Sequence, residues 1–221
     1  MNRPVLIALI AAGVIVAGGI GYFAFQNGDA SAQTASAPAE NSSELLAPGP
    51  LPEQVLGEAN APVTIVEYAS LSCSHCREFH EKTLPELKTR YIDTGKVRLI
   101  FRDFPLDNLA MAGAMIARCG GEGKYFPIVD AFFKGQSSIT NDTDIFKWLE
   151  NFGKQVGLTT ESFEACLSNR ELQDNLTSVR ETASQKFGVN STPTFFINGK
   201  IVRGALTIEE FEKEIEPLLK S

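Results

Sequence analysis

The sequence is short of histidine, cysteine and positive charge, and each shortage argues against a class of function. Among 221 residues there are two histidines and four cysteines, whereas a structural zinc site usually needs Cys or His ligands arranged in close pairs. The formal net charge is −7 at pH 7, which argues against binding to nucleic acid or to an anionic lipid surface. What is present, 43% hydrophobic and 21% charged residues, is the composition of an ordinary globular domain.

Charged residues are also missing from positions 5–25, an apolar run that follows Arg3. At about 1.5 Å per residue, a helix of this length covers roughly the 30 Å hydrocarbon core of a membrane. No Lys or Arg occurs between Phe25 and Arg77, so the positive-inside rule keeps the short N-terminus in the cytoplasm and sends the rest outward. We therefore predict a transmembrane signal anchor within residues 1–25 and a periplasmic or other extracytoplasmic domain, held at the inner membrane.

The alternative is a cleaved signal peptide, because Ala30-Ser31-Ala32 has the small-x-small pattern of a cleavage site. The mature protein would then be soluble after cleavage near Ala32. Residues 26–56 are rich in Ala, Ser, Pro, Asn and Gly, and we predict that they form a flexible linker. Residues 57–221 are the predicted folded domain, whose cysteines can be oxidised outside the cytoplasm.

The predicted domain alternates between strand-like and helix-like segments, which indicates an α/β fold. A buried strand is expected at 63–68, followed by a helix at 73–92 and a second strand at 97–101. Pro85 lies inside the helix and predicts a kink. A βαβ unit of this kind implies that its two strands are parallel.

An all-helical insert is predicted at about 107–187, because apolar residues there recur at intervals of three and four. Its helices are expected at 108–118, 124–133, 143–156, 160–167 and 171–187. Beyond the insert, Asn198-Gly199 separates two apolar runs and predicts a β-hairpin. Thr207 and Glu210 have the spacing of a capping box that opens the last helix.

Cys73 and Cys76 stand where the first strand meets its helix. A thiolate is favoured over the unpaired amides of a helix N-terminus, and one helical turn brings the second sulfur within bridging reach. This spacing predicts a redox-active disulfide that exchanges with the disulfides of other proteins. From the residues alone, half of a zinc site or a Cu(I)-binding pair of thiols is the alternative.

The strand before Cys73-Ser74-His75-Cys76, the helical insert and the segment 191–199 (Ser-Thr-Pro-Thr-Phe-Phe-Ile-Asn-Gly) together resemble the DsbA family of thioredoxin-like oxidoreductases. The resemblance implies a thioredoxin-like fold with an inserted all-helical subdomain, and a dithiol oxidase that introduces disulfides into unfolded or reduced client proteins. It also implies a quinone-linked membrane partner for reoxidation, and no cofactor besides the Cys73–Cys76 disulfide. Because Ser74 replaces the proline common among strong oxidases, a reductase or isomerase of the same fold is the alternative.

The resemblance also assigns the segment around Pro193 to the site. It implies a cis peptide bond between Thr192 and Pro193, lying beside Cys73 in space. The backbone of Thr192 is then expected to hydrogen-bond an extended substrate strand. A trans proline at the start of a strand is the alternative.

Two polar residues near the cysteines are further candidates. We expect His75 to stabilise the Cys73 thiolate through a hydrogen bond or its charge, and the alternative is an ordinary surface residue. Strand alternation places Glu67 on a face of the sheet that helices cover. The resemblance implies that this buried acid relays a proton to or from Cys76, and the alternative is an acid at a hydrated strand end.

Cys119 and Cys166 both lie in the helical insert. We predict that they form a second disulfide, which in the loop-entropy description stabilises the fold by roughly 4 kcal/mol for a closed loop of about 48 residues. Two independent buried thiols are the alternative.

Overall fold

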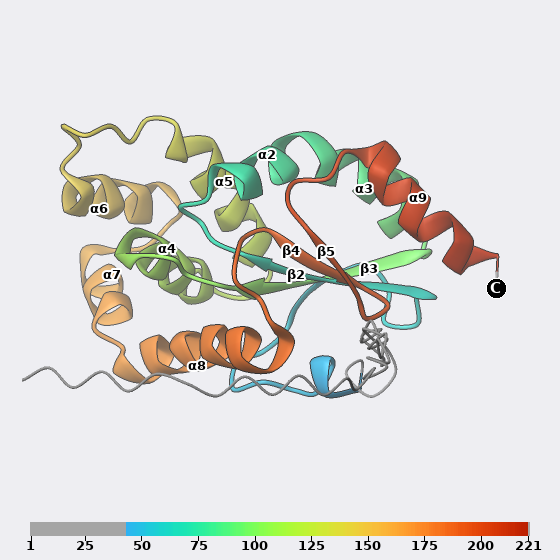
Figure 1. Ribbon diagram of the computed structural model, residues 1–221. Helices are drawn as coiled ribbons and strands as arrows, with labels where there is room; N and C mark the ends of the chain where they lie inside the picture. Colours follow the sequence, from blue (N-terminus) through green and yellow to red (C-terminus); the bar gives the residue numbers. More distant parts are fainter. Residues whose placement is uncertain (1–42, 221) are drawn as a thin grey trace, which may run out of the picture. The chain divides into compact units, whose positions relative to one another are not determined.

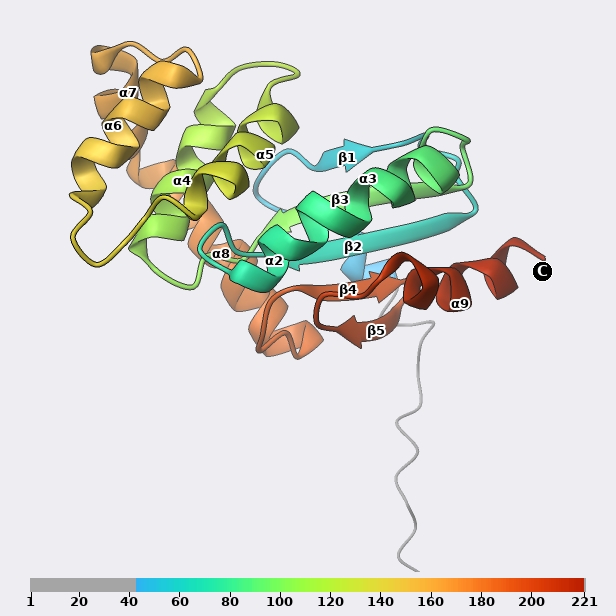
Figure 2. The same ribbon diagram turned by 90° about the horizontal axis from the view of Figure 1, so that it is seen from above.

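The computed structural model describes residues 43–220, which contain one mixed β-sheet covered by helices (Figures 1 and 2). Its strands are β1 (Gln54–Leu56), β2 (Val63–Ala69), β3 (Val97–Asp103), β4 (Thr194–Ile197) and β5 (Lys200–Arg203). They lie in the order β1-β3-β2-β4-β5, and Figure 2 shows them side by side. β2 and β3 are parallel, as the predicted βαβ unit requires, and the other neighbouring pairs are antiparallel.

The helical segment between β2 and β3 spans the predicted range but changes its winding along its length. It consists of α2 (Ser74–Glu78), a π-helical turn η1 (Phe79–Thr83), α3 (Leu84–Leu87) and a second π-helical turn η2 (Lys88–Ile92). Pro85 lies in the first turn of α3, directly after η1. Since proline has no amide hydrogen to donate, the change of hydrogen-bond register in η1 lets the helix pass this residue.

The remaining helices agree with the predicted insert and C-terminal helix to within a few residues. They are α4 (Asn108–Cys119), α5 (Tyr125–Gln136), α6 (Ile145–Gln155), α7 (Thr160–Leu167), α8 (Arg170–Phe187) and α9 (Ile208–Leu219). Thr207 caps α9 together with Glu210 in the predicted capping box. The predicted hairpin is also present, and Asn198 at its turn has a φ of 44°, in the left-handed region.

The helices cover both faces of the sheet and one of its ends (Figure 1). Alternation along β2 sends Val63 and Ile65 to the face under α2, α3 and α9, where they join one core cluster. Val66 and Tyr68 point to the other face and pack with residues of α8. Helices α4 to α7 enclose a separate core at the end of the sheet, which also includes Cys76. The chain therefore has a thioredoxin-like α/β fold with an inserted helical subdomain.

The predicted linker over residues 26–56 is too long at its C-terminal end, where the chain already belongs to the folded domain. Leu45 is only 3% exposed and packs with Val66 and Phe196, and β1 pairs with β3 at the edge of the sheet. Residues 43–56 looked like part of a linker because they are rich in small residues and proline, while β1 forms by pairing with β3, which lies far along the chain. The predicted anchor at 5–25 and the cleavage site near Ala32 lie outside the described residues. Within residues 43–220, no helix is long and apolar enough to cross a membrane.

Candidate active site

Cys73 is the N-cap residue of α2, and this position sets the geometry of the cysteine pair. Its backbone is extended, with φ −85° and ψ 121°, and its Sγ accepts a hydrogen bond from the backbone N–H of Cys76 at 3.4 Å. Cys73 is partly exposed, whereas Cys76 is completely buried. The outer sulfur is therefore open to attack, and the inner one is shielded.

The loop before β4 returns to Cys73 from more than one hundred residues along the chain. The Thr192–Pro193 peptide bond is cis, as predicted, and the Cys73 thiol donates a hydrogen bond to the carbonyl oxygen of Thr192 at 3.3 Å. The predicted proximity of these residues is therefore confirmed.

The surroundings of the two thiols drive their pKa values in opposite directions. The side-chain hydrogen bond with the Cys76 thiol has the largest influence on the pKa of Cys73. Although burial opposes it, this bond lowers the pKa of Cys73 to about 5, together with hydrogen bonds from Thr192 and from the backbone at Cys76 and His75. Burial raises the pKa of Cys76 well above its ordinary value, and the charges of Cys73 and Glu67 raise it further. One sulfur is held as a thiolate and the other as a thiol.

His75 contributes to the site through its backbone. Its side chain is exposed, and among the hydrogen bonds of residues 43–220 none joins its imidazole to Cys73. The predicted side-chain hydrogen bond is therefore not made in the described structure, in which the imidazole is exposed to solvent. The contribution of its charge stays a prediction.

Glu67 is buried, as predicted, and it has a partner, His80, that the sequence did not predict. Glu67 is 0% exposed, and the Nε2 atom of His80 lies 3.1 Å from each of its carboxylate oxygens. On the other side, His80 Nδ1 lies 3.7 Å from Oδ1 of Asp130, the distance of an ion pair rather than a hydrogen bond. Burial alone would lower the pKa of His80, but the two carboxylates raise it to about 9. The spacing of His80, four residues after Cys76 and on the same helix face, was the signal for this contact.

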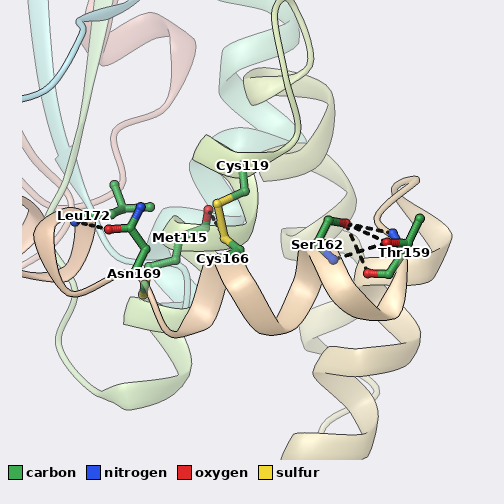
Figure 3. The surroundings of a disulfide bond; sticks show 7 residues. All are labelled: Met115, Cys119, Thr159, Ser162, Cys166, Asn169 and Leu172. Carbon is green, nitrogen blue, oxygen red and sulfur yellow. Dashed lines mark hydrogen bonds between the residues drawn. A yellow bond between two sulfur atoms is a disulfide. The ribbon is translucent and has the colours of Figure 1, made fainter.

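The predicted second disulfide is present in the helical insert. Cys119 at the end of α4 is bonded to Cys166 in α7, with the two Cα atoms 6.1 Å apart (Figure 3). The bond joins two helices of the insert and leaves Cys73 and Cys76 as the two free cysteines of the described chain. Residues 43–220 contain no group of three or more His, Cys, Asp or Glu side chains arranged to hold a metal ion.

Several known proteins are similar to this chain. The protein-family model described as Thioredoxin matches residues 51–217. The crystal structure of Wolbachia pipientis alpha-DsbA1 is similar, with a TM-score of 0.73 and 33% identity, over 81% of this chain and 96% of that chain. "Disulfide bond formation protein D" of Bacillus subtilis is 26% identical over 176 residues, which are 76% of this chain and 78% of that protein.

A third relative is longer than this chain. The "Putative protein-disulfide oxidoreductase" of Rickettsia bellii is 30% identical over 148 residues, which are 66% of this chain. The match spans 57% of that protein's length. The fold, the family match and the similarity to alpha-DsbA1 agree, and the chain belongs to the DsbA family of thioredoxin-like thiol:disulfide oxidoreductases.

Proposed function

We propose that this protein is an exported dithiol oxidase that introduces disulfides into client proteins through Cys73 and Cys76. The observation that carries the proposal is the opposite tuning of the paired thiols, with the pKa of Cys73 lowered to about 5 and that of Cys76 raised. A stabilised Cys73 thiolate favours the reduced, dithiol form of the enzyme, and this makes the disulfide form a strong oxidant.

The reaction transfers one disulfide in two exchange steps. A client thiolate attacks Sγ of Cys73 in the Cys73–Cys76 disulfide, so that a mixed disulfide forms and Cys76 leaves with the bonding electrons and takes up a proton. A second client thiolate then attacks the client's own sulfur in the mixed disulfide, and Cys73 leaves as a thiolate. The client loses two electrons and the enzyme gains them.

The surroundings of Cys73 suit a polypeptide substrate. The Thr192 carbonyl lies beside the sulfur, where it is placed to accept a backbone hydrogen bond from an extended client segment at Pro193. Unfolded or reduced proteins are therefore the proposed clients. We further propose that a quinone-linked membrane protein reoxidises the dithiol, and that no cofactor other than the cysteine pair takes part.

The redox potential of the full-length protein, measured against glutathione, tests the direction of the reaction. Potentials of about −120 mV for DsbA and about −270 mV for thioredoxin mark the two extremes. We expect a value closer to the former. A value near that of thioredoxin would contradict the proposed oxidase function and favour a reductase or isomerase. This is the alternative suggested by Ser74, which replaces the proline common among strong oxidases.

Trapping of mixed disulfides tests which cysteine bonds to the client. In Cys76→Ala the Cys73 thiolate attacks a client disulfide, whose other sulfur leaves as a thiolate, and no internal thiol remains to reverse the mixed disulfide, so client proteins should stay covalently bound to the enzyme. Cys73→Ala is the matched control and should trap none. A protein that instead binds Cu(I) stoichiometrically and traps no clients would be a copper-binding thiol module.

A further inference from the structure

We propose that His80 and Asp130 form the outer part of a proton path that connects Cys76 to solvent through Glu67. The inference rests on the proposed function, because it concerns the proton that Cys76 must take up when it is expelled from the disulfide. It adds two positioning residues, one on the active-site helix and one on the helical insert.

The path joins four ionisable groups, first through a charge interaction and then through the contacts of His80 with two carboxylates. The charge of Glu67 acts on the Cys76 thiol at the inner end. Both oxygens of Glu67 lie 3.1 Å from Nε2 of His80, and the opposite ring nitrogen faces Asp130. The side chain of Asp130 is 49% exposed, whereas that of His80 is 2% exposed. Asp130 therefore connects the buried imidazole to water.

Among the described residues, the surroundings of His80 leave the carboxylates of Glu67 and Asp130 as the acceptors for its proton. Its ring packs against Phe79, Phe101 and Phe133, with centroid distances of 4.7 to 5.5 Å. These aromatic rings supply no proton acceptor. The Nδ1 atom is buried without a hydrogen bond in the described structure, so the carboxylate of Asp130, at ion-pair distance, is the charged group that faces it.

The other titratable groups around this cluster are also accounted for. On the helix of His80 itself the group is Cys76, and β2 contributes Glu67. Helix α5 contributes Asp130 and Tyr125, whose pKa is raised by burial and then by Asp103, with a smaller effect from Glu67. Tyr125 donates its hydroxyl hydrogen bond to Asp103, so it takes no proton from the His80 side.

The proposed transfer balances one proton in each exchange. When a client thiolate attacks Cys73, the Cys73–Cys76 bond breaks and its electron pair stays on Cys76. The His80 imidazolium gives a proton to the Glu67 carboxylate, which passes it on to this sulfur, and His80 is refilled from solvent at Asp130. Reoxidation runs the same steps backwards and releases the proton to solvent. Because the pKa of Cys76 is raised, it is a poor leaving group without this proton.

The test measures single-turnover reduction of the oxidised full-length protein by dithiothreitol across a range of pH. Rates of Asp130→Asn are divided by those of the wild type at each pH, which cancels the ionisation of the probe itself. Loss of an opposite charge near an ionisable group shifts its pKa by about one unit or more. The wild-type rate should therefore equal the variant rate below about pH 7 and exceed it by about tenfold above about pH 9.

Two further variants keep this test specific. Glu81→Gln removes an exposed acid next to His80 in the chain and should give a ratio of one at every pH. Asp130→Glu keeps the charge and should restore the wild-type profile. A flat Asp130→Asn ratio, whether at one or at a uniformly lower value, would overturn the inference. A wild-type protein that exchanges no faster than a simple disulfide would overturn the proposed function itself, and the inference with it.

Discussion

The Sγ atom of Cys73 lies 3.3 Å from the carbonyl oxygen of Thr192, although 119 positions separate the two residues in the chain. This carbonyl can accept a hydrogen bond from the thiol but not from a thiolate, which has no proton to donate. The hydroxyl oxygen of Thr192 is buried and makes no hydrogen bond in the described structure, while the side chain of Thr192 lowers the pKa of Cys73. Thr192 therefore carries an acceptor for the thiol form of Cys73 and a donor for the thiolate form.

Replacing Thr192 by valine should raise the pKa of Cys73 from its value of about 5. A hydrogen bond to a charged group is worth about 1.5–3 kcal/mol, so we expect a rise of about one to two pH units. The ultraviolet absorbance of the thiolate measures it during a pH titration. Thr194→Val is the control, because the Thr194 hydroxyl bonds to the Ser191 carbonyl. Equal pKa values in the two variants would show that the Thr192 hydroxyl does not act on the sulfur.

The reduced protein should gain stability from Cys73 as pH rises from about 5 to about 8.5. In this range the unfolded thiol, with a pKa of about 8.5, binds a proton that the folded thiolate does not. The contribution is complete above the unfolded pKa and is lost as pH falls through the folded pKa of about 5. His80 acts oppositely, because its folded pKa of about 9 exceeds the ordinary histidine pKa of about 6.5. Its contribution is complete below about 6.5 and is lost as pH rises through about 9.

Comparison with Cys73→Ser isolates the cysteine, since His80 is common to both proteins and cancels in the difference. The measurement is urea unfolding of both reduced proteins at several pH values. The stability difference should grow between pH 5 and 8.5 and disappear below pH 5. A difference independent of pH would mean that the thiolate is not stabilised by the fold.

Patterns that are local in the chain predicted most of this fold correctly. The capping box at Thr207, the Asn198-Gly199 turn and the position of Cys73 at a helix start all depend on residues within a few positions of one another. β1 was missed because three residues among prolines and glycines carry no strand signal, and their pairing with β3 becomes visible only when the chain is folded.

Some residues of the candidate site could likewise be predicted from the sequence, and others could not. The burial of Glu67 followed from strand alternation, and the approach of Thr192 followed from the family resemblance. The place of Asp130 could not be predicted, because it depends on how α5 of the insert packs over the active-site helix. For His75 the described structure shows a backbone contribution to the pKa of Cys73, and the predicted contribution of its side-chain charge stays a prediction.

Removing the Cys119–Cys166 disulfide should destabilise the protein without abolishing exchange at Cys73. The closed loop, with a sequence separation of 47, corresponds to about 4 kcal/mol in the chain-entropy description. Urea unfolding of the double variant Cys119→Ser/Cys166→Ser measures the loss, with Cys73 and Cys76 oxidised in both proteins. A loss below about 1 kcal/mol would show that the bond does not restrict the unfolded chain as this description requires.

Replacing one partner of the Asp103–Arg118 ion pair should lower the free energy of unfolding more than replacing one partner of any surface ion pair. Asp103 is 2% exposed and accepts hydrogen bonds from Arg118 Nε and from the Tyr125 hydroxyl, each at 2.8 Å. Its Oδ2 atom also forms an ion pair with Arg118 Nη2 at 2.7 Å. These contacts hold the end of β3 to α4 and α5. Arg118 also donates a hydrogen bond to the carbonyl of Pro52, just before β1.

Asp103→Asn should therefore cost about 3–5 kcal/mol of unfolding free energy, because it leaves the largely buried Arg118 charge without its counter-ion. Tyr125→Phe removes a single neutral donor and should cost only about 1–3 kcal/mol of unfolding free energy. This figure includes the cost of leaving one oxygen of Asp103 without its hydrogen bond. Adding Arg118→Met to Asp103→Asn should recover part of the loss, since the unpaired charge is then gone. Urea unfolding of the oxidised protein measures all three. If the double variant is no more stable than Asp103→Asn, the loss arises from disturbed packing between β3 and α4 rather than from an uncompensated charge.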